Sequence, residues 1–158
     1  MSLLYTDAQI QAMLAEPKPL RDDFQQRLVL KPKPGHKERE LDIDGEAGTK
    51  YRLILRQANI NPLDFSVILA VLDEKSTRVF RLRRYNGKSH EYTNKMERET
   101  FYDFHVHTAT ERYQAGGYAE DSYAVGSDAY GDFGGALDLM LAQNGFATPP
   151  NAQLALFS

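Results

Sequence analysis

The sequence predicts an α+β domain in which a mostly antiparallel sheet of four or five strands packs against an N-terminal and a C-terminal helix. Three observations support this fold class. Apolar residues recur at helical spacing near both ends of the chain, apolar and polar residues alternate through much of the middle, and turn-forming residues separate the alternating segments. The chain has 158 residues, close to the usual size of one domain. We expect a single domain over residues 1–146.

The first helix is expected to begin after Thr6 and to end before Pro17. Thr6 can accept a hydrogen bond from the backbone of the first turn, and Gln9 stands three residues later, as in a capping box. The apolar stripe of this helix consists of Ile10, Met13 and Leu14. A second, short helix is indicated over residues 20–28, and the run 31–35, which contains Pro and Gly, is typical of a connector.

Strands are expected where the apolar period changes to two. They are residues 38–43, 50–58, 65–72, 77–85 and 100–108. The first two flank the turn-forming run 44–48 and predict a hairpin. The third is apolar on both faces, which suits a strand in the middle of the sheet. Asn86-Gly87 is a strong turn signal after the fourth, and residues 88–99 show no period.

Two helices follow the last strand. Thr108 and Glu111 have the spacing of a capping box for a short helix that ends before Gly116. The last helix has apolar residues at i, i+3, i+4, i+7 and i+8, namely Phe133, Ala136, Leu137, Met140 and Leu141. Gly145 stands where a left-handed residue often ends a helix. Residues 147–158 form a tail that is either docked on the protein or disordered.

The composition excludes several classes of protein. There is no cysteine, which excludes disulfides, thiolate metal sites and a cysteine nucleophile. The sequence has neither a signal-peptide pattern nor an apolar stretch long enough to span a membrane. We therefore expect a cytoplasmic protein that has no membrane partner, and no motif calls for a cofactor.

The charge is unevenly distributed, although the formal net charge is only −3. Residues 75–98 contain eight basic and two acidic residues, whereas residues 113–158 contain five acidic residues and neither lysine nor arginine. The basic segment favours an anionic partner, unless the two segments lie against each other and neutralise.

Two histidines of the strand 100–108 are the first candidates for function. Because side chains alternate along a strand, its two faces can be separated from the sequence. One face carries Tyr102, Phe104 and Val106, and the other carries Asp103, His105 and His107. The apolar row is expected to face the core, which leaves both histidines on an open face or in a cleft.

The basic strand 77–85 extends this face if it lies in the same sheet. Alternation along this strand predicts that Phe80 and Leu82 face the core. The side chains predicted to face outward are Arg81, Arg83 and Tyr85. In residues 51–56 the alternation does not decide which row faces the core. With the polar rows aligned, one face would carry Arg52, Arg56, Arg81, Arg83, Asp103, His105 and His107.

One interpretation of this face is the binding or cleavage of nucleic acid or another phosphate-bearing ligand. His105 and His107 would act as acid and base, and Glu111 would orient a histidine. Arg81 and Arg83 would hold the phosphate. The enzyme would then be a metal-independent phosphodiesterase, similar to ribonucleases in residue types only.

Two other interpretations of the histidine pair remain open. The pair could bind a metal ion, with Asp103 or His90 as a third ligand. Alternatively, the histidines order the edge of the sheet, and the protein is a non-catalytic interaction or structural module, assembled as a homo-oligomer.

The turn after the basic strand is a second candidate region. Arg83, Arg84, Tyr85 and His90 suit contacts with a phosphate backbone. The same run is also typical of an exposed hairpin turn whose arginines protect a strand edge.

Three stretches carry a resemblance to known sequences. They are Arg-Arg-Tyr-Asn-Gly at 83–87, His-Val-His-Thr-Ala-Thr-Glu-Arg-Tyr-Gln at 105–114 and Asn-Gly-Phe at 144–146. With these, the chain from Arg83 to Phe146 resembles proteins of an uncharacterised bacterial family. That resemblance implies neither a fold nor an activity.

Overall fold

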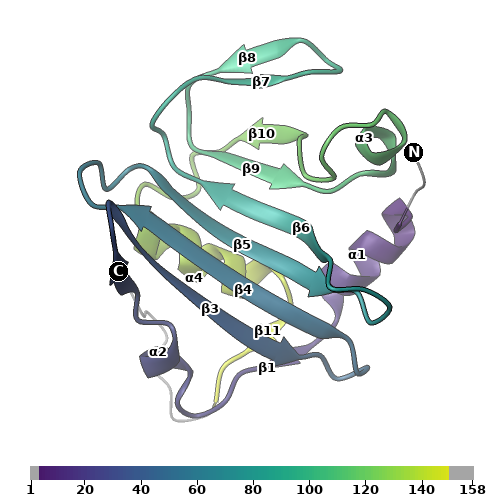
Figure 1. The fold of residues 1–158 in the computed structure, drawn as a ribbon, viewed down its shortest axis with the longest axis vertical. Coiled ribbons are helices and arrows are strands. Elements are labelled where there is room, and N and C mark those ends of the chain that lie inside the picture. The colour runs from purple at the N-terminus through teal and green to yellow at the C-terminus, as the bar shows by residue number, and fades with distance from the viewer. Residues whose placement is uncertain (1–3, 150–158) are drawn as a thin grey trace.

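The computed structural model describes residues 4–149 and has the α+β architecture that the sequence predicts (Figure 1). Seven strands form one sheet in the order β10-β9-β6-β5-β4-β3-β2, and all neighbours are antiparallel. These strands are β2 (Lys31–Lys33), β3 (His36–Asp44), β4 (Lys50–Ala58), β5 (Phe65–Leu72), β6 (Val79–Asn86), β9 (His105–Thr108) and β10 (Ala124–Gly126).

The sheet has more strands than the four or five expected. The two outermost strands, β2 and β10, have three residues each and are too short to show alternation. β2 lies in the run that the sequence presents as a connector, and its Pro32 is tolerated because an edge strand needs no second hydrogen-bonding partner. The predicted hairpin is confirmed as β3–β4, and the doubly apolar β5 is confirmed at the centre of the sheet.

The helices are α1 (Asp7–Ala15), α2 (Phe24–Arg27), α3 (Glu111–Ala115) and α4 (Phe133–Gln143). α1 has the predicted capping box between Thr6 and Gln9. α4 is followed by Gly145 with a φ of +79°, as its position predicts. The cap of α3 is Thr110 and not Thr108, because Thr108 still belongs to β9.

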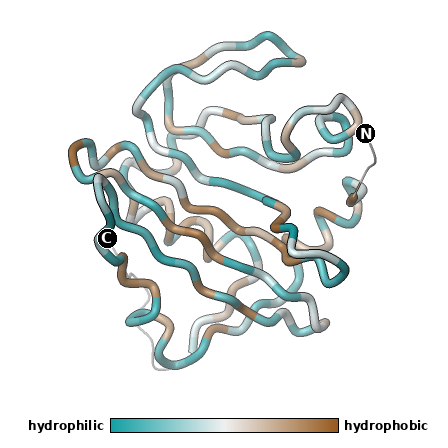
Figure 2. The backbone as a smooth tube through the Cα atoms, in the orientation of Figure 1, coloured by the Kyte–Doolittle hydropathy of each residue, from teal (hydrophilic) through white to brown (hydrophobic). Residues whose placement is uncertain are grey.

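One face of the sheet carries the apolar core. Buried side chains of α1, α2 and α4 pack there against the inward rows of β4 and β5, which are Tyr51, Leu53 and Leu55, and Phe65, Val67, Leu69 and Val71. Figure 2 shows the hydrophobic colour concentrated on these central strands. The opposite face of β3, β4 and β5 is turned to the viewer in Figure 1 and carries none of the described helices.

The expected strand 100–108 is two strands in the structure. β8 (Glu99–Phe101) pairs with β7 (Tyr92–Asn94) in a separate hairpin, and β9 joins the main sheet. Asp103 lies in the bend between them. Residues 88–99 contain β7 and the start of β8. They show no period, because a three-residue strand is too short to display alternation.

A β-bulge in β6 exchanges the faces of the residues that follow it. Ala70 pairs with Arg81 and Leu69 pairs with Arg83, so Leu82 is an extra residue on β6. The prediction that Arg83 and Tyr85 point outward is therefore wrong. A period of two cannot reveal an inserted residue, and one insertion moves every later side chain to the other face.

A segment that follows the first helix pairs beside the sheet with a segment that follows the last helix. β1 (Lys18–Pro19) pairs in parallel with β11 (Phe146–Ala147). The buried ammonium of Lys18 donates to the carbonyls of Met13, Leu14 and Glu16 at the end of α1, and to that of Asn144 after α4, at 2.7–3.2 Å. The predicted tail thus begins in β11, and its residues 150–158 lie outside the described residues.

Candidate functional site

The sheet register places most of the predicted arginines and histidines on one face, opposite α4. Three cross-strand rows share this face: Asp42–Arg52–Ala70–Arg81, Glu40–Ile54–Ile68–Arg84–His107 and Glu38–Arg56–Ser66–Asn86–His105. Arg84 takes the position that alternation assigned to Arg83, because of the bulge in β6.

His105 and His107 are enclosed by the β7–β8 hairpin. Their exposed fractions are 3% and 0%. Tyr92 of β7 stacks on His105 with 5.2 Å between ring centroids and meets His107 edge-on at 4.6 Å. Phe101 of β8 meets His105 edge-on at 5.6 Å. The expectation of an open face or a cleft is wrong here, because the covering hairpin lies in a segment that shows no strand period.

Each histidine ring is held by a backbone carbonyl. Nδ1 of His105 donates to Asp103 O at 2.8 Å, and Nδ1 of His107 donates to Asp121 O at 2.7 Å. Nε2 of His107 accepts a long hydrogen bond from Asn86 Nδ2, at 3.4 Å. Burial, aided by the charge of Arg84, lowers the pKa of His107 to about 2, and burial also lowers the pKa of His105. Both rings are neutral at pH 7, so neither has a proton to give as a general acid.

The arginines next to the histidines already have counter-charges. Arg84 Nε lies 3.3 Å from Asp121 Oδ2, and Arg81 Nε lies 3.4 Å from Glu120 Oε2. Both carboxylates are buried, and burial raises the pKa of Asp121 although Arg84 and Arg81 oppose this. Among the described residues, neither Arg84 Nε nor Asp121 Oδ2 has a hydrogen-bond partner. The basic and acidic segments thus lie against each other at this point.

Glu111 does not reach the histidines. Its Oε1 accepts a hydrogen bond from the backbone N–H of Asp7 at 2.7 Å, and a carboxylate oxygen of Asp7 accepts from the N–H of Glu111 at 2.8 Å. Each carboxylate therefore binds at the N-terminus of the other's helix, where the helix dipole favours negative charge. This contact joins α1 to α3 and does not orient a ring.

The other predicted residues also lie apart from the histidine pair. Arg83 donates to Asn144 Oδ1 at 2.9 Å and Tyr85 donates to Gln143 Oε1 at 2.7 Å, both on the face that α4 covers. His90 and Asp103 are exposed, and Asp103 holds His105 through its carbonyl only. Within residues 4–149, no group of three or more ligating side chains is placed to hold a metal ion.

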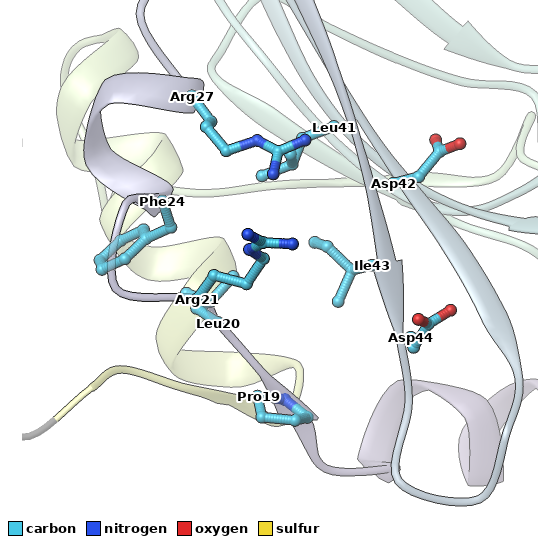
Figure 3. A pocket seen from close by; sticks show the side chains of 9 residues that line it. All are labelled: Pro19, Leu20, Arg21, Phe24, Arg27, Leu41, Asp42, Ile43 and Asp44. Carbon is cyan, nitrogen blue, oxygen red and sulfur yellow. The ribbon is translucent and has the colours of Figure 1, made fainter.

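A pocket of about 260 Å³ lies between residues 19–27 and β3 (Figure 3). Its lining consists of Pro19, Leu20, Arg21, Phe24, Arg27, Leu41, Asp42, Ile43 and Asp44. Leu41 and Ile43 point into the pocket, whereas the carboxylates of Asp42 and Asp44 point to the other side of β3. The pocket therefore has an apolar floor and receives no carboxylate from β3.

The rim of this pocket is basic. Arg21 and Arg27 line it (Figure 3). Arg27 also lines a neighbouring hollow, whose other lining residues are Arg39, Glu40, Leu41, Asp42 and Arg52. Arg27 and Arg39 are half-buried, and neither guanidinium has a hydrogen bond or an ion pair within residues 4–149. Arg21 is 77% exposed and has only a 3.6 Å ion pair with Asp23. We call the pocket, together with the neighbouring hollow that Arg27 and Arg39 line, the arginine pocket.

The arginine pocket was not identified from the sequence. Arg39 alternates with Leu41 and Ile43 in β3, so the pattern does place these three on one face. Arg21 and Arg27, however, belong to a segment with no clear period. Their position beside β3 is a contact between segments distant in the sequence, which has no local sequence signal.

Comparisons with protein-family models, with curated proteins and with solved structures found no match to this chain. No helix in the part of the chain from residue 4 to residue 149 is long and apolar enough to cross a membrane. The function must therefore be argued from the geometry itself.

Proposed function

We propose that the protein is a non-catalytic binding protein for an anionic ligand, such as an organic phosphate or carboxylate, and that the arginine pocket is its site. The observation that carries this proposal is the pair of half-buried guanidinium groups, Arg27 and Arg39, without acceptors in the described residues. Both residues line the same hollow, so an anion placed there is attracted by two positive charges. Guanidinium groups also bind phosphate and carboxylate oxygens through paired N–H donors.

The histidine and arginine sheet face supports this function less well. A phosphate at Arg81 and Arg84 would have to displace Glu120 and Asp121, whose carboxylates are buried. Removing one partner from a buried ion pair is strongly unfavourable, by about 3–5 kcal/mol. We therefore propose that a phosphate-bearing ligand binds in the arginine pocket and not on the sheet face.

Titration with inorganic phosphate, followed by backbone NMR at constant ionic strength, tests the proposal. We expect the amide signals of residues 20–28 and 39–43 to shift and to saturate, and sodium chloride alone to leave them unchanged. Arg27→Gln should weaken binding at least tenfold. Arg56→Gln is the matched control, because Arg56 is an exposed arginine on the opposite face. Equal effects of both variants, or no saturable shift, would contradict the proposal.

A further inference from the structure

The arginine pocket is divided between a charged rim and an apolar floor. The guanidinium groups of Arg21 and Arg27 form the rim. The floor consists of Leu20, Phe24, Leu41 and Ile43, whose exposed fractions are 8%, 1%, 7% and 8%. A pocket with a positively charged rim and an apolar floor suits a ligand that has one anionic part and one apolar part.

The floor offers a ligand few polar partners. Asp42 and Asp44, the polar side chains that β3 contributes next to the floor, point away from it (Figure 3). Their carboxylates bind Arg52 and Lys50 on the opposite face, at 2.7 Å and 2.6 Å. A sugar or a base on this floor would lose its hydrogen bonds to water without replacing them, at a cost of about 1–3 kcal/mol for each buried group.

One acid does compete for the rim. Asp23 Oδ1 lies 3.6 Å from Arg21 Nε, is itself buried and has no hydrogen-bond partner in the part of the chain that the structure describes. Arg21 is therefore partly neutralised, whereas Arg27 is not. The anionic group of a ligand is expected at Arg27, on the side shared with Arg39. Glu40 and Asp42 also line that side, but their carboxylates pair with Arg52, at 3.8 Å and 2.7 Å.

We infer that the ligand is a small amphiphilic anion, in which a phosphate or carboxylate at Arg27 carries a short apolar body that lies on Leu41 and Ile43. This inference rests on the anion-binding function proposed above and adds the class of ligand. A volume of 260 Å³ is roughly nine times the share of one water molecule in the liquid. The pocket therefore holds on the order of nine non-hydrogen atoms, enough for a phosphate group and about four carbons.

A series of alkyl phosphates tests the inference on the wild-type protein. Inorganic, methyl, ethyl, butyl and hexyl phosphate are titrated below their critical micelle concentrations, and affinity is measured by calorimetry and NMR. We expect affinity to rise roughly three- to fourfold for each of the first methylenes. It should level off near butyl, where the pocket is full. Arg27→Gln should weaken every member of the series by a similar factor, and Ile54→Thr, on the opposite face, should change nothing.

The possible results separate the two proposals. If inorganic phosphate shifts residues 20–28 but affinity does not change with chain length, the ligand class is wrong and the anion site stands. If no member of the series binds, both proposals fail. A chain-length gain that persists in full in Arg27→Gln, with signal shifts elsewhere in the molecule, would indicate binding at another surface and would also overturn the inference.

Discussion

The buried ring of His107 makes the stability of the protein sensitive to acid. Burial lowers its pKa to about 2 in the folded state, against 6.5 for the free side chain. Between these two values the unfolded chain binds a proton and the native protein does not. The free energy of unfolding is therefore highest above pH 6.5 and falls as the pH decreases.

The size of this effect follows from the linkage relation. His107 of the unfolded chain takes up a proton below pH 6.5, so only about 1.5 pH units of the range from pH 7.5 to pH 5.0 count. Over that interval the protonation of His107 alone stabilises the unfolded state by about 2 kcal/mol. His105 acts in the same direction, because burial also lowers its pKa. Asp121 acts in the opposite direction, because burial raises its pKa and the native protein takes up that proton first.

Urea denaturation at several pH values, with wild type and His107→Gln, measures the His107 contribution. The difference between their slopes with pH removes the contributions of His105 and Asp121, which both proteins share. We expect the variant to lose about 2 kcal/mol less than wild type between pH 7.5 and pH 5.0. Met96→Leu, at an exposed position without a titratable group, is the control and should keep the wild-type slope. If His107→Gln folds at pH 7.5 and also keeps that slope, the reasoning is refuted.

Four further substitutions probe other contacts of the fold. Lys18→Met should lower the free energy of unfolding by about 2–4 kcal/mol in urea, because four carbonyls at the ends of α1 and α4 lose their donor; an unchanged midpoint would contradict this. Gly87→Ala should cost about 3 kcal/mol or more, since its Cβ would lie 1.8 Å from the carbonyl oxygen of Leu63. Gly131→Ala, where a Cβ meets nothing within 4 Å, should be nearly neutral by comparison. Tyr92→Ala should admit water to His105 and move its pKa, followed by the NMR shifts of its ring protons, back toward 6.5; no change would show that Tyr92 is not what keeps water out.

The sequence was most informative where a local pattern and the tertiary structure agree. The doubly apolar run of β5 fits a central strand, because side chains of β4 and β6 flank both of its faces and reduce their exposure to water. The caps at Thr6 and Gly145 are local interactions, so they can be recognised without knowledge of the rest of the fold.

The sequence was least informative where one residue or one distant segment changes the outcome. The extra Leu82 in β6 places Arg83 and Tyr85 on the core face, and no pattern in the amino-acid sequence marks an inserted residue. The cover over His105 and His107 comes from Tyr92 and Phe101, in strands of three residues each. Alternation placed both histidines on the correct face of the sheet, but it cannot show what covers that face.

The meeting of β1 with β11 has a consequence for synthesis on the ribosome. The pairings from β2 to β6 join strands that follow each other in the chain, so this part of the sheet can form early. The ammonium of Lys18, by contrast, can bind the carbonyl of Asn144 only after a further 126 residues have been synthesised. At 5–20 residues per second this delay is roughly 6–25 s. Throughout that interval α1 lacks this link to the segment after α4, so its apolar side chains, Ile10 and Leu14, are the ones that chaperones would have to protect.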